Sequence, residues 1–207
     1  MPIVSHYSKS AGAATASLLL ALSLSACGTE NGTQDTDNGQ EAAENSSQES
    51  GFVEAERAGV SFEVPSEWDA QSEDQADEGW EPGFILYEGD EPVGWVGIYT
   101  SLTEENDPNL TGELITVGTL RDLRLTRGYE VKSKEEVDIS GAKSAFAVNY
   151  TLPNDDENRE IVYATDIGIV TSELRALNVR AQMIVDSNEA RPSELDHIVN
   201  SVKVEEE

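Results

Sequence analysis

The feature that most limits what this chain can fold into is its single cysteine, which lies at position 27. It follows an uncharged run of apolar and small residues at positions 11–24 and the pair Ser25 and Ala26. That run is shorter than the roughly 20 residues that a membrane-spanning helix needs, but it suits the core of a signal peptide with a small-residue cleavage site. We therefore expect residues 1–26 to be an export signal, cleaved between Ala26 and Cys27.

Leu24, Ser25, Ala26 and Cys27 resemble, position by position, the lipobox of bacterial lipoproteins. The resemblance implies that the Cys27 thiol receives a diacylglyceryl group and that Cys27 becomes the new N-terminus. It also implies a lipid-anchored protein on the extracytoplasmic face of the cell membrane. The alternative is an ordinary secretory signal with an incidental cysteine.

Acylation of Cys27 would leave the exported domain without a free thiol. Such a domain forms no disulfide and no thiolate metal site, so a hydrophobic core alone must stabilise it. We predict that this domain covers residues 52–207, which is enough chain to build such a core.

Between the anchor and the domain, positions 28–50 contain six acidic residues, no basic residue and no large apolar residue. A segment of this composition cannot bury enough surface to offset the entropy lost on ordering. We predict that residues 27–51 are a disordered acidic linker that begins with the lipidated Cys27.

The whole chain carries a net charge of −28, from 41 acidic and 13 basic residues. Because nucleic-acid binding depends on clustered Lys and Arg, this balance argues against a nucleic-acid partner. It also argues against electrostatic attachment of the protein to anionic lipid, so the acyl chains would have to hold it at the membrane.

Alternating or continuous apolar runs predict six strands in the domain. They are 60–64, 84–87, 93–99, 142–152, 161–170 and 177–185. In the first strand Phe62 and its flanking valines face inward, and Pro65 ends the strand. The fourth and fifth strands should pair as an antiparallel hairpin, with Phe146 and Val148 buried.

A first helix is predicted over 110–127, with Gly128 as its C-cap. Its apolar residues fall on one arc that we expect to face the core: Leu110, Leu114, Val117, Leu120 and Leu125. Pro192 and Ser193 open a second helix, with Ser193 and Asp196 as a capping box. Its apolar stripe is Leu195, Ile198, Val199 and Val202.

Strands joined by short turns, with few helices, indicate an α+β fold. We expect an antiparallel sheet flanked by the middle helix and the C-terminal helix.

The opening of the domain, GVSFEVPSEW at positions 59–68, is similar to that of PsbP-like domains, in which a strand is followed by Pro65 and then by Trp68. It looks especially like the LpqN-type lipoproteins of actinobacteria, and the order of strands and helices fits over roughly residues 52–204. The resemblance implies the same antiparallel sheet flanked by helices. It also implies binding and envelope accessory roles, and it carries over no catalytic residue.

Catalytic signals in the domain are weak. Its one histidine, His197, lies beside Asp196, but no Gly-x-Ser-x-Gly motif nominates a serine for a triad. We interpret His197 as a helix-boundary residue, and we predict no cofactor or metal site. The many acidic residues leave one alternative open, an envelope hydrolase that uses paired carboxylates.

Two charged segments each have two interpretations. The acidic loop 66–82 is best explained as a solvated surface, and the alternative is a cation or basic-partner site around 73–81.

Arg121, Arg124 and Arg127 are best explained as cations that complement the dipole at the end of the first helix. The alternative for these arginines is a site for an anionic headgroup.

Together these patterns predict a membrane-anchored lipoprotein of the cell envelope that is not an enzyme. Its domain would act as a binding or accessory module for a lipid or protein partner.

Overall fold

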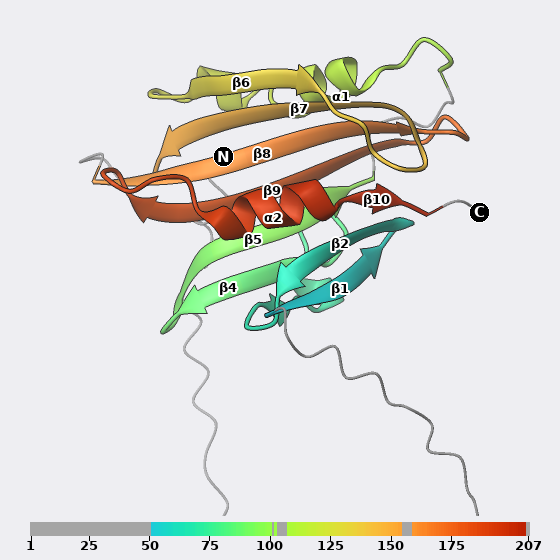
Figure 1. Ribbon diagram of the computed structural model, residues 1–207. Coiled ribbons are helices and arrows are strands. Elements are labelled where there is room, and N and C mark those ends of the chain that lie inside the picture. The colour runs from blue at the N-terminus through green and yellow to red at the C-terminus, as the bar shows by residue number, and fades with distance from the viewer. Residues whose placement is uncertain (1–50, 101, 103–106, 155–158, 206–207) are drawn as a thin grey trace, which may run out of the picture.

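The computed structural model describes residues 51–100, 102, 107–154 and 159–205. These residues form two antiparallel sheets and two α-helices, which confirms the predicted α+β class (Figure 1). The larger sheet has seven strands in the order β3-β4-β5-β9-β8-β7-β6, and the smaller has three in the order β1-β2-β10.

The first half of the domain contains β1 (Phe52–Arg57), β2 (Val60–Pro65), β3 (Asp69–Ala70), the 3₁₀ helix η2 (Glu73–Gln75), β4 (Phe84–Glu88), β5 (Glu91–Tyr99) and α1 (Gly112–Thr119). The second half contains the 3₁₀ helix η3 (Leu123–Leu125), β6 (Glu130–Glu136), β7 (Ala142–Pro153), β8 (Glu160–Thr171), β9 (Ala176–Asp186), α2 (Ser193–Ser201) and β10 (Lys203–Val204).

The small sheet was not anticipated as a separate sheet. Its β1–β2 hairpin turns at Ala58 and Gly59, whose φ angles of 52° and 74° suit a two-residue turn that matches strand twist. On the other side of β2, Lys203 pairs with Ser61, so the end of the described chain completes the sheet. The sequence did not predict β1 or β10, because β1 is largely charged and β10 is only two residues long.

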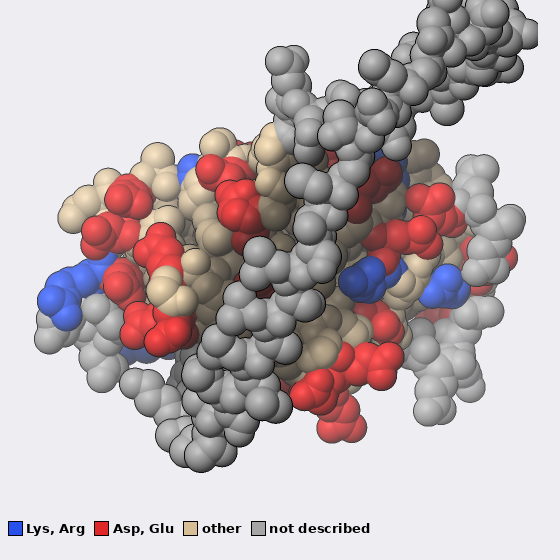
Figure 2. Space-filling model, turned by 90° about the horizontal axis from the view of Figure 1, so that it is seen from below, with Lys and Arg blue, Asp and Glu red and all other residues tan. Residues whose placement is uncertain are grey.

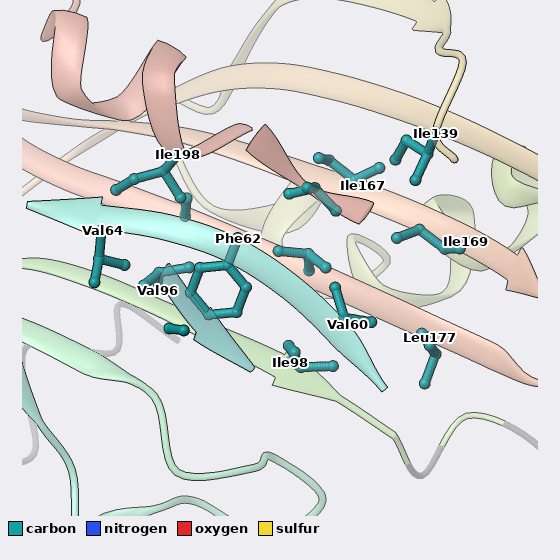
Figure 3. Close-up of a cluster of buried hydrophobic side chains, with 14 of the residues drawn as sticks. Val60, Phe62, Val64, Val96, Ile98, Ile139, Ile167, Ile169, Leu177 and Ile198 are labelled. Atoms are coloured by element: carbon teal, nitrogen blue, oxygen red, sulfur yellow. The ribbon is translucent and has the colours of Figure 1, made fainter. Parts of the chain in front are cut away.

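The main core lies between the small sheet and one face of the large sheet (Figure 3). Val60, Phe62 and Val64 are at most 1% exposed, which confirms the predicted inward face of this strand. They pack with large-sheet residues such as Ile98 and Ile167.

The predicted hairpin of the second half is also present. β7 and β8 pair along their lengths, from Ala142 opposite Thr171 to Pro153 opposite Ile161. Val148 is buried as predicted, but Phe146 is only half-buried, so this part of the prediction is wrong. Phe146 lies opposite Gly168 in the ladder, and it packs at the margin of the cluster that contains Val148.

The first helix is shorter than predicted and turns a different face inward. It ends at Thr119, and only η3 follows it before β6. Its buried residues are Gly112, Ile115 and Thr116, whereas Leu114 is 55% and Val117 is 42% exposed. Leu120 of the predicted arc is buried and Leu110 is half-buried, but Leu114, Val117 and Leu125 are exposed, so this part of the arc was wrong. Arg121, Arg124 and Arg127 lie beyond the last turn whose dipole they were expected to complement.

The second helix begins at Ser193, as predicted, and its apolar stripe is confirmed by the burial of Leu195 and Ile198. The predicted capping box is wrong. Pro192 is the N-cap, and Ser193 donates its hydroxyl hydrogen bond to Glu194 instead of capping the helix. Within the described part of the chain, neither helix is long and apolar enough to cross a membrane.

Alternate residues of β8 contact the two helices. Ile167 and Ile169 belong to the cluster that contains α2 residues Leu195 and Ile198. Val170 packs instead with Ile115 of α1. Because successive side chains of a strand point to opposite faces, α1 and α2 pack on opposite faces of the large sheet.

Candidate functional site

The predicted lipidation site, Cys27, and the predicted cleavage position after Ala26 lie outside the described residues. The acylation of Cys27 therefore stays a prediction. The domain itself contains one concentrated polar site, which lies on the α1 side of the large sheet.

An ion pair between β8 and β9 forms the centre of this site. Asp166 lies directly opposite Arg180 in the ladder. Arg180 donates from Nε to Oδ1 at 2.6 Å and from Nη2 to Oδ2 at 2.7 Å, a two-bond geometry that is the strong form of this pair. Asp166 is fully buried and Arg180 is 6% exposed.

Three further donors complete the surroundings of the carboxylate. The Tyr150 hydroxyl donates to Oδ1 at 3.0 Å. Thr119 Oγ1 and Asn178 Nδ2 donate to Oδ2 at 3.2 and 3.3 Å. Donors from β7, β9 and the last residue of α1 thus bond to both oxygens of this β8 carboxylate, so the network links the helix to three strands of the sheet.

The electrostatics of the network preserve its charge state. Burial acts to lower the pKa of Arg180, but the Asp166 carboxylate outweighs burial and raises that pKa well above its ordinary range. Burial raises the pKa of the Tyr150 hydroxyl, and Asp166 raises it further against the opposing effect of Arg180. Arg180 therefore stays charged while Tyr150 stays neutral.

The raised pKa of Tyr150 predicts a loss of stability at alkaline pH. An unfolded tyrosine ionises near pH 10, whereas the folded one keeps its proton, so this contribution is full below about pH 10 and is lost as pH rises through the folded pKa. We expect the free energy of unfolding to fall above pH 10 by up to about 1.4 kcal/mol per pH unit for this group. Urea unfolding between pH 9 and 11, in steps of about one unit, should show a flatter dependence for Tyr150→Phe. Equal slopes in the two proteins would contradict this assignment.

The arrangement of Asp166 does not suit general acid or base chemistry. A catalytic carboxylate must reach a substrate proton, but Asp166 is fully buried and its oxygens already accept five hydrogen bonds. It is also the one acidic residue among the buried polar residues that the structure describes. We interpret this network as a structural core element.

Aromatic side chains cover the Arg180 end of the network. The guanidinium carbon lies 5.3 Å from the centre of the Trp80 ring. Trp80 packs edge-on against Trp95 at 4.9 Å and tilted against Tyr99 at 5.2 Å. Trp95 Nε1 donates to Gln71 Oε1 at 2.9 Å, and Trp80 forms a backbone bridge with Tyr99. Two residues of the predicted loop 66–82 thus contact β5.

The contacts of the acidic loop 66–82 bear on whether it is a solvated surface or a cation or basic-partner site. Glu81 accepts a hydrogen bond from Thr100 Oγ1 at 3.2 Å. No group of three or more His, Cys, Asp or Glu side chains that could hold a metal ion occurs in the described ranges. Figure 2 shows acidic side chains spread over the visible face, which includes the side of β1 and β4.

His197 lies within α2 and not at its boundary, so the predicted placement is wrong. Its Nε2 lies 2.6 Å from Glu63 Oε2 of β2, and its ring stacks on Phe52 with centroids 3.7 Å apart. Asp196 does not orient this ring, because it accepts a hydrogen bond from Arg191 Nε instead. The contact pins α2 to the small sheet, close to the start of the domain.

Sequence reasoning missed the Asp166–Arg180 pair. One signal was available, because Asp166 is the one charged residue in the otherwise uncharged run 161–170. A charge in the middle of a buried strand requires a partner, and the register of the next hairpin would have placed Arg180 opposite it.

No protein-family model matches the sequence, and no curated protein matches it. The similar solved structures include two that cover about three quarters of this chain. One is cyanobacterial PsbP (CyanoP) from Synechocystis sp. PCC 6803, with 15% identity, a TM-score of 0.49, and coverage of 74% of this chain and 92% of CyanoP. The other is LpqN of Mycobacterium tuberculosis, described as involved in cell envelope biogenesis, with 10% identity, a TM-score of 0.47, and coverage of 75% of this chain and 91% of LpqN.

Proposed function

We propose that this protein is a membrane-anchored lipoprotein of the cell envelope whose domain is a non-catalytic binding or accessory module for a lipid or protein partner. The observation that carries the proposal is the position of Cys27. The one cysteine of the chain directly follows a signal-like apolar run and two small residues. Acylation of the Cys27 thiol by a diacylglyceryl group would explain why the one cysteine of the chain lies at this position.

The acidic composition makes a covalent anchor necessary for stable attachment. Removal of residues 1–26 removes Lys9 and no acidic residue, so the net charge changes from −28 to −29. Such a protein is repelled as a whole by anionic lipid. Acyl chains contribute about 0.8 kcal/mol per buried CH₂, and two or more chains give durable attachment where one does not.

The polar site of the domain favours a binding role over a hydrolytic one. The oxygens of its buried carboxylate, Asp166, already accept hydrogen bonds from Arg180 and from three neutral donors. In the described part of the chain, His197 contacts Glu63 and Phe52, neither of which is a nucleophile. These groups are explained by packing and need no substrate.

The motif that resembles PsbP-like domains, a strand followed by Pro65 and Trp68, is explained by packing within this domain. β2 ends at Pro65, and the Trp68 side chain returns to the core, where it is 6% exposed. A Cβ on Gly94 would lie 3.0 Å from the Trp68 ring, so the ring packs directly on the backbone of β5. The motif therefore has a structural role in this domain.

Cys27→Ser should abolish acylation and, with it, durable membrane attachment of the mature chain, because it removes the thiol that would accept the lipid. We expect wild-type protein to be labelled by radioactive palmitate and recovered with membranes. The Cys27→Ser protein should be unlabelled and either unprocessed or shed. The measurement is metabolic labelling followed by membrane fractionation.

A matched control moves the thiol within the same segment, by combining Cys27→Ser with Ser46→Cys. We expect this protein to remain unlabelled, because the cysteine no longer follows the small-residue pair. Palmitate label on either variant would reject the lipobox assignment. Hydrolysis of an ester or glycan by the purified chain, abolished by one carboxylate substitution, would reject the non-catalytic role.

A further inference from the structure

Apolar side chains that face solvent are concentrated on one segment of the domain. The described residues include five large hydrophobic side chains that are exposed, and four of them lie between positions 114 and 131: Leu114, Val117, Leu125 and Val131. Leu125 is the most exposed of them, at 83%. Isolated exposed hydrophobic residues are common, but four on one segment of a strongly charged protein indicate an interaction surface.

These four side chains lie on the same side of the large sheet. Leu114 and Val117 are three positions apart in α1, on the helix face opposite the buried Ile115 and Thr116. Val131 pairs with Tyr150, so it points to the same side as the Tyr150 ring, which packs with Leu120 and Leu123. Leu125 closes η3, between α1 and β6.

The same segment carries the chain's densest group of basic residues. Arg121, Arg124 and Arg127 are all exposed. Arg121 pairs with Asp122 at 3.2 Å in a solvent-exposed contact, and the charge of Arg124 acts on Tyr129. None of the three lies in the last turn of α1, so the helix dipole does not explain why they gather here. We call the three arginines and the four exposed apolar residues the α1–β6 patch.

The charge of this patch contrasts with the rest of the protein. From Leu114 to Val131 there are three basic residues and two acidic residues, Asp122 and Glu130, in a chain of net charge −28. In contrast, Arg57 is the one basic residue between positions 51 and 120. Figure 1 places α1 and β6 at the top and β1 and β4 at the bottom, where the face in Figure 2 is rich in acidic side chains. The patch therefore lacks the large acidic excess of the rest of the chain.

We propose that the α1–β6 patch docks the domain on an anionic phospholipid surface. Arginines beside exposed aliphatic side chains are the combination that binds the interface of an anionic membrane, where the apolar groups enter and the cations meet headgroups. The proposal rests on the proposed function, because the anchor would bring the domain to such a surface. It names the lipid partner and the residues that contact it.

The net negative charge of the protein does not prevent this contact. At about 0.15 M salt the screening length is about 8 Å. A domain of this length has a radius of gyration of about 15 Å, so acidic residues on the far side lie several screening lengths from the lipid. The membrane then responds mainly to the α1–β6 patch.

The tether is also long enough. The domain begins at Phe52 in β1, on the side of the molecule away from β6 (Figure 1). The chain from Cys27 to Phe52 can extend to about 80 Å at 3.3–3.6 Å per residue, more than twice the width of the domain. Anchoring at Cys27 and docking through the patch can therefore occur together.

The test uses the processed chain, residues 27–207, with Cys27→Ser, so that no anchor contributes. Sedimentation with vesicles at about 0.15 M salt should show binding to phosphatidylcholine vesicles that contain phosphatidylglycerol, and far less to vesicles of phosphatidylcholine alone. Arg127→Glu should lower the partition coefficient about thirtyfold, from about tenfold per 1.4 kcal/mol and about 1 kcal/mol per unit of charge. Leu125→Gln should lower it about tenfold.

Two matched controls separate the patch from overall composition. Lys203→Glu makes the same charge change in β10, and Val53→Gln replaces the exposed apolar residue that lies outside the patch, in β1. Both should leave the partition coefficient within about twofold, because neither residue reaches the docked surface. Circular dichroism of each variant checks that the fold is intact.

Several outcomes would overturn the docking proposal. They are absence of binding to phosphatidylglycerol vesicles, equal binding to both vesicle types, and equal losses for Arg127→Glu and Lys203→Glu. Binding of poly-glutamate without vesicle binding would assign the patch to an acidic protein partner instead. Because the test protein has no acyl group, these results are independent of whether wild-type Cys27 is labelled by palmitate.

Discussion

Arg180→Met is expected to lower the free energy of unfolding by about 3–5 kcal/mol, because it leaves the buried Asp166 carboxylate without its counter-charge. Transferring an unpaired charge out of water is far more costly than losing one hydrogen bond. Three neutral donors, from Tyr150, Thr119 and Asn178, would remain around the carboxylate but could not neutralise it. Urea unfolding monitored by tryptophan fluorescence measures the loss.

Two controls locate the effect in the buried pair. Arg121→Met removes an arginine from a contact whose partners are 81% and 77% exposed, so it should change stability by less than about 0.5 kcal/mol. The double variant Asp166→Leu with Arg180→Met removes both charges and should lose less than Arg180→Met alone. A loss below about 1 kcal/mol for Arg180→Met, or a double variant less stable than the single one, would show that the pair does not carry this role.

Phe62→Ala is expected to cost about 3–5 kcal/mol, as is usual when a buried phenylalanine is truncated to alanine. Phe62 is 1% exposed, and its ring packs edge-on against Phe84 with centroids 6.1 Å apart. It lies in the layer between the small and large sheets, so its loss would open a cavity between two sheets that share no strand (Figure 3). Equilibrium unfolding in urea measures the cost.

Val53→Ala is the matched control, because Val53 lies in the neighbouring strand and is 48% exposed. It should change stability by no more than about 0.5 kcal/mol. If Phe62→Ala lost no more than Val53→Ala, the small sheet would not be packed on the large one as described.

Several strands were predictable because a half-buried strand has alternating apolar residues and a fully buried strand has a continuous apolar run. The run from Val60 to Val64 alternates, and Pro65 ends it, so both the strand and its inward face were confirmed. β6 was missed for the opposite reason. β6 has the sequence EVKSKEE and lies at the edge of the large sheet, where none of its side chains is fully buried. It therefore has no periodic pattern of apolar residues that could identify it as a strand.

The inward face of α1 was mispredicted because the helix approaches the sheet through small residues. A Cβ on Gly112 would lie 2.4 Å from the Gly168 carbonyl oxygen, and a Cβ on Gly168 would lie 2.2 Å from that of Gly112. Such close backbone contact requires glycine on both sides. A hydrophobic pattern instead points to the leucines, and here Leu114 and Leu125 are left in solvent.

The buried polar network could not be recognised from composition alone. Asp166 is one of 41 acidic residues and Arg180 one of 13 basic ones, and nothing local marks them as partners. Their pairing depends on the β8–β9 register, and the position of Thr119 depends on how α1 lies over both strands. For Cys27 the reverse holds, because its predicted role depends on local sequence and needs no tertiary contact.

The strand order places a constraint on how this protein folds. β9 lies between β5 and β8, so Ile98 of the first half pairs with Val179 of the second. β6 to β9 can assemble from neighbouring hairpins, whereas β5 can pair with β9 only after nearly the whole domain has been made. Closing so long a loop costs conformational entropy before any contact repays it, and topologies of this kind fold slowly. A chain threaded outward from its N-terminus would therefore expose the unpaired edge of β5 for most of its passage.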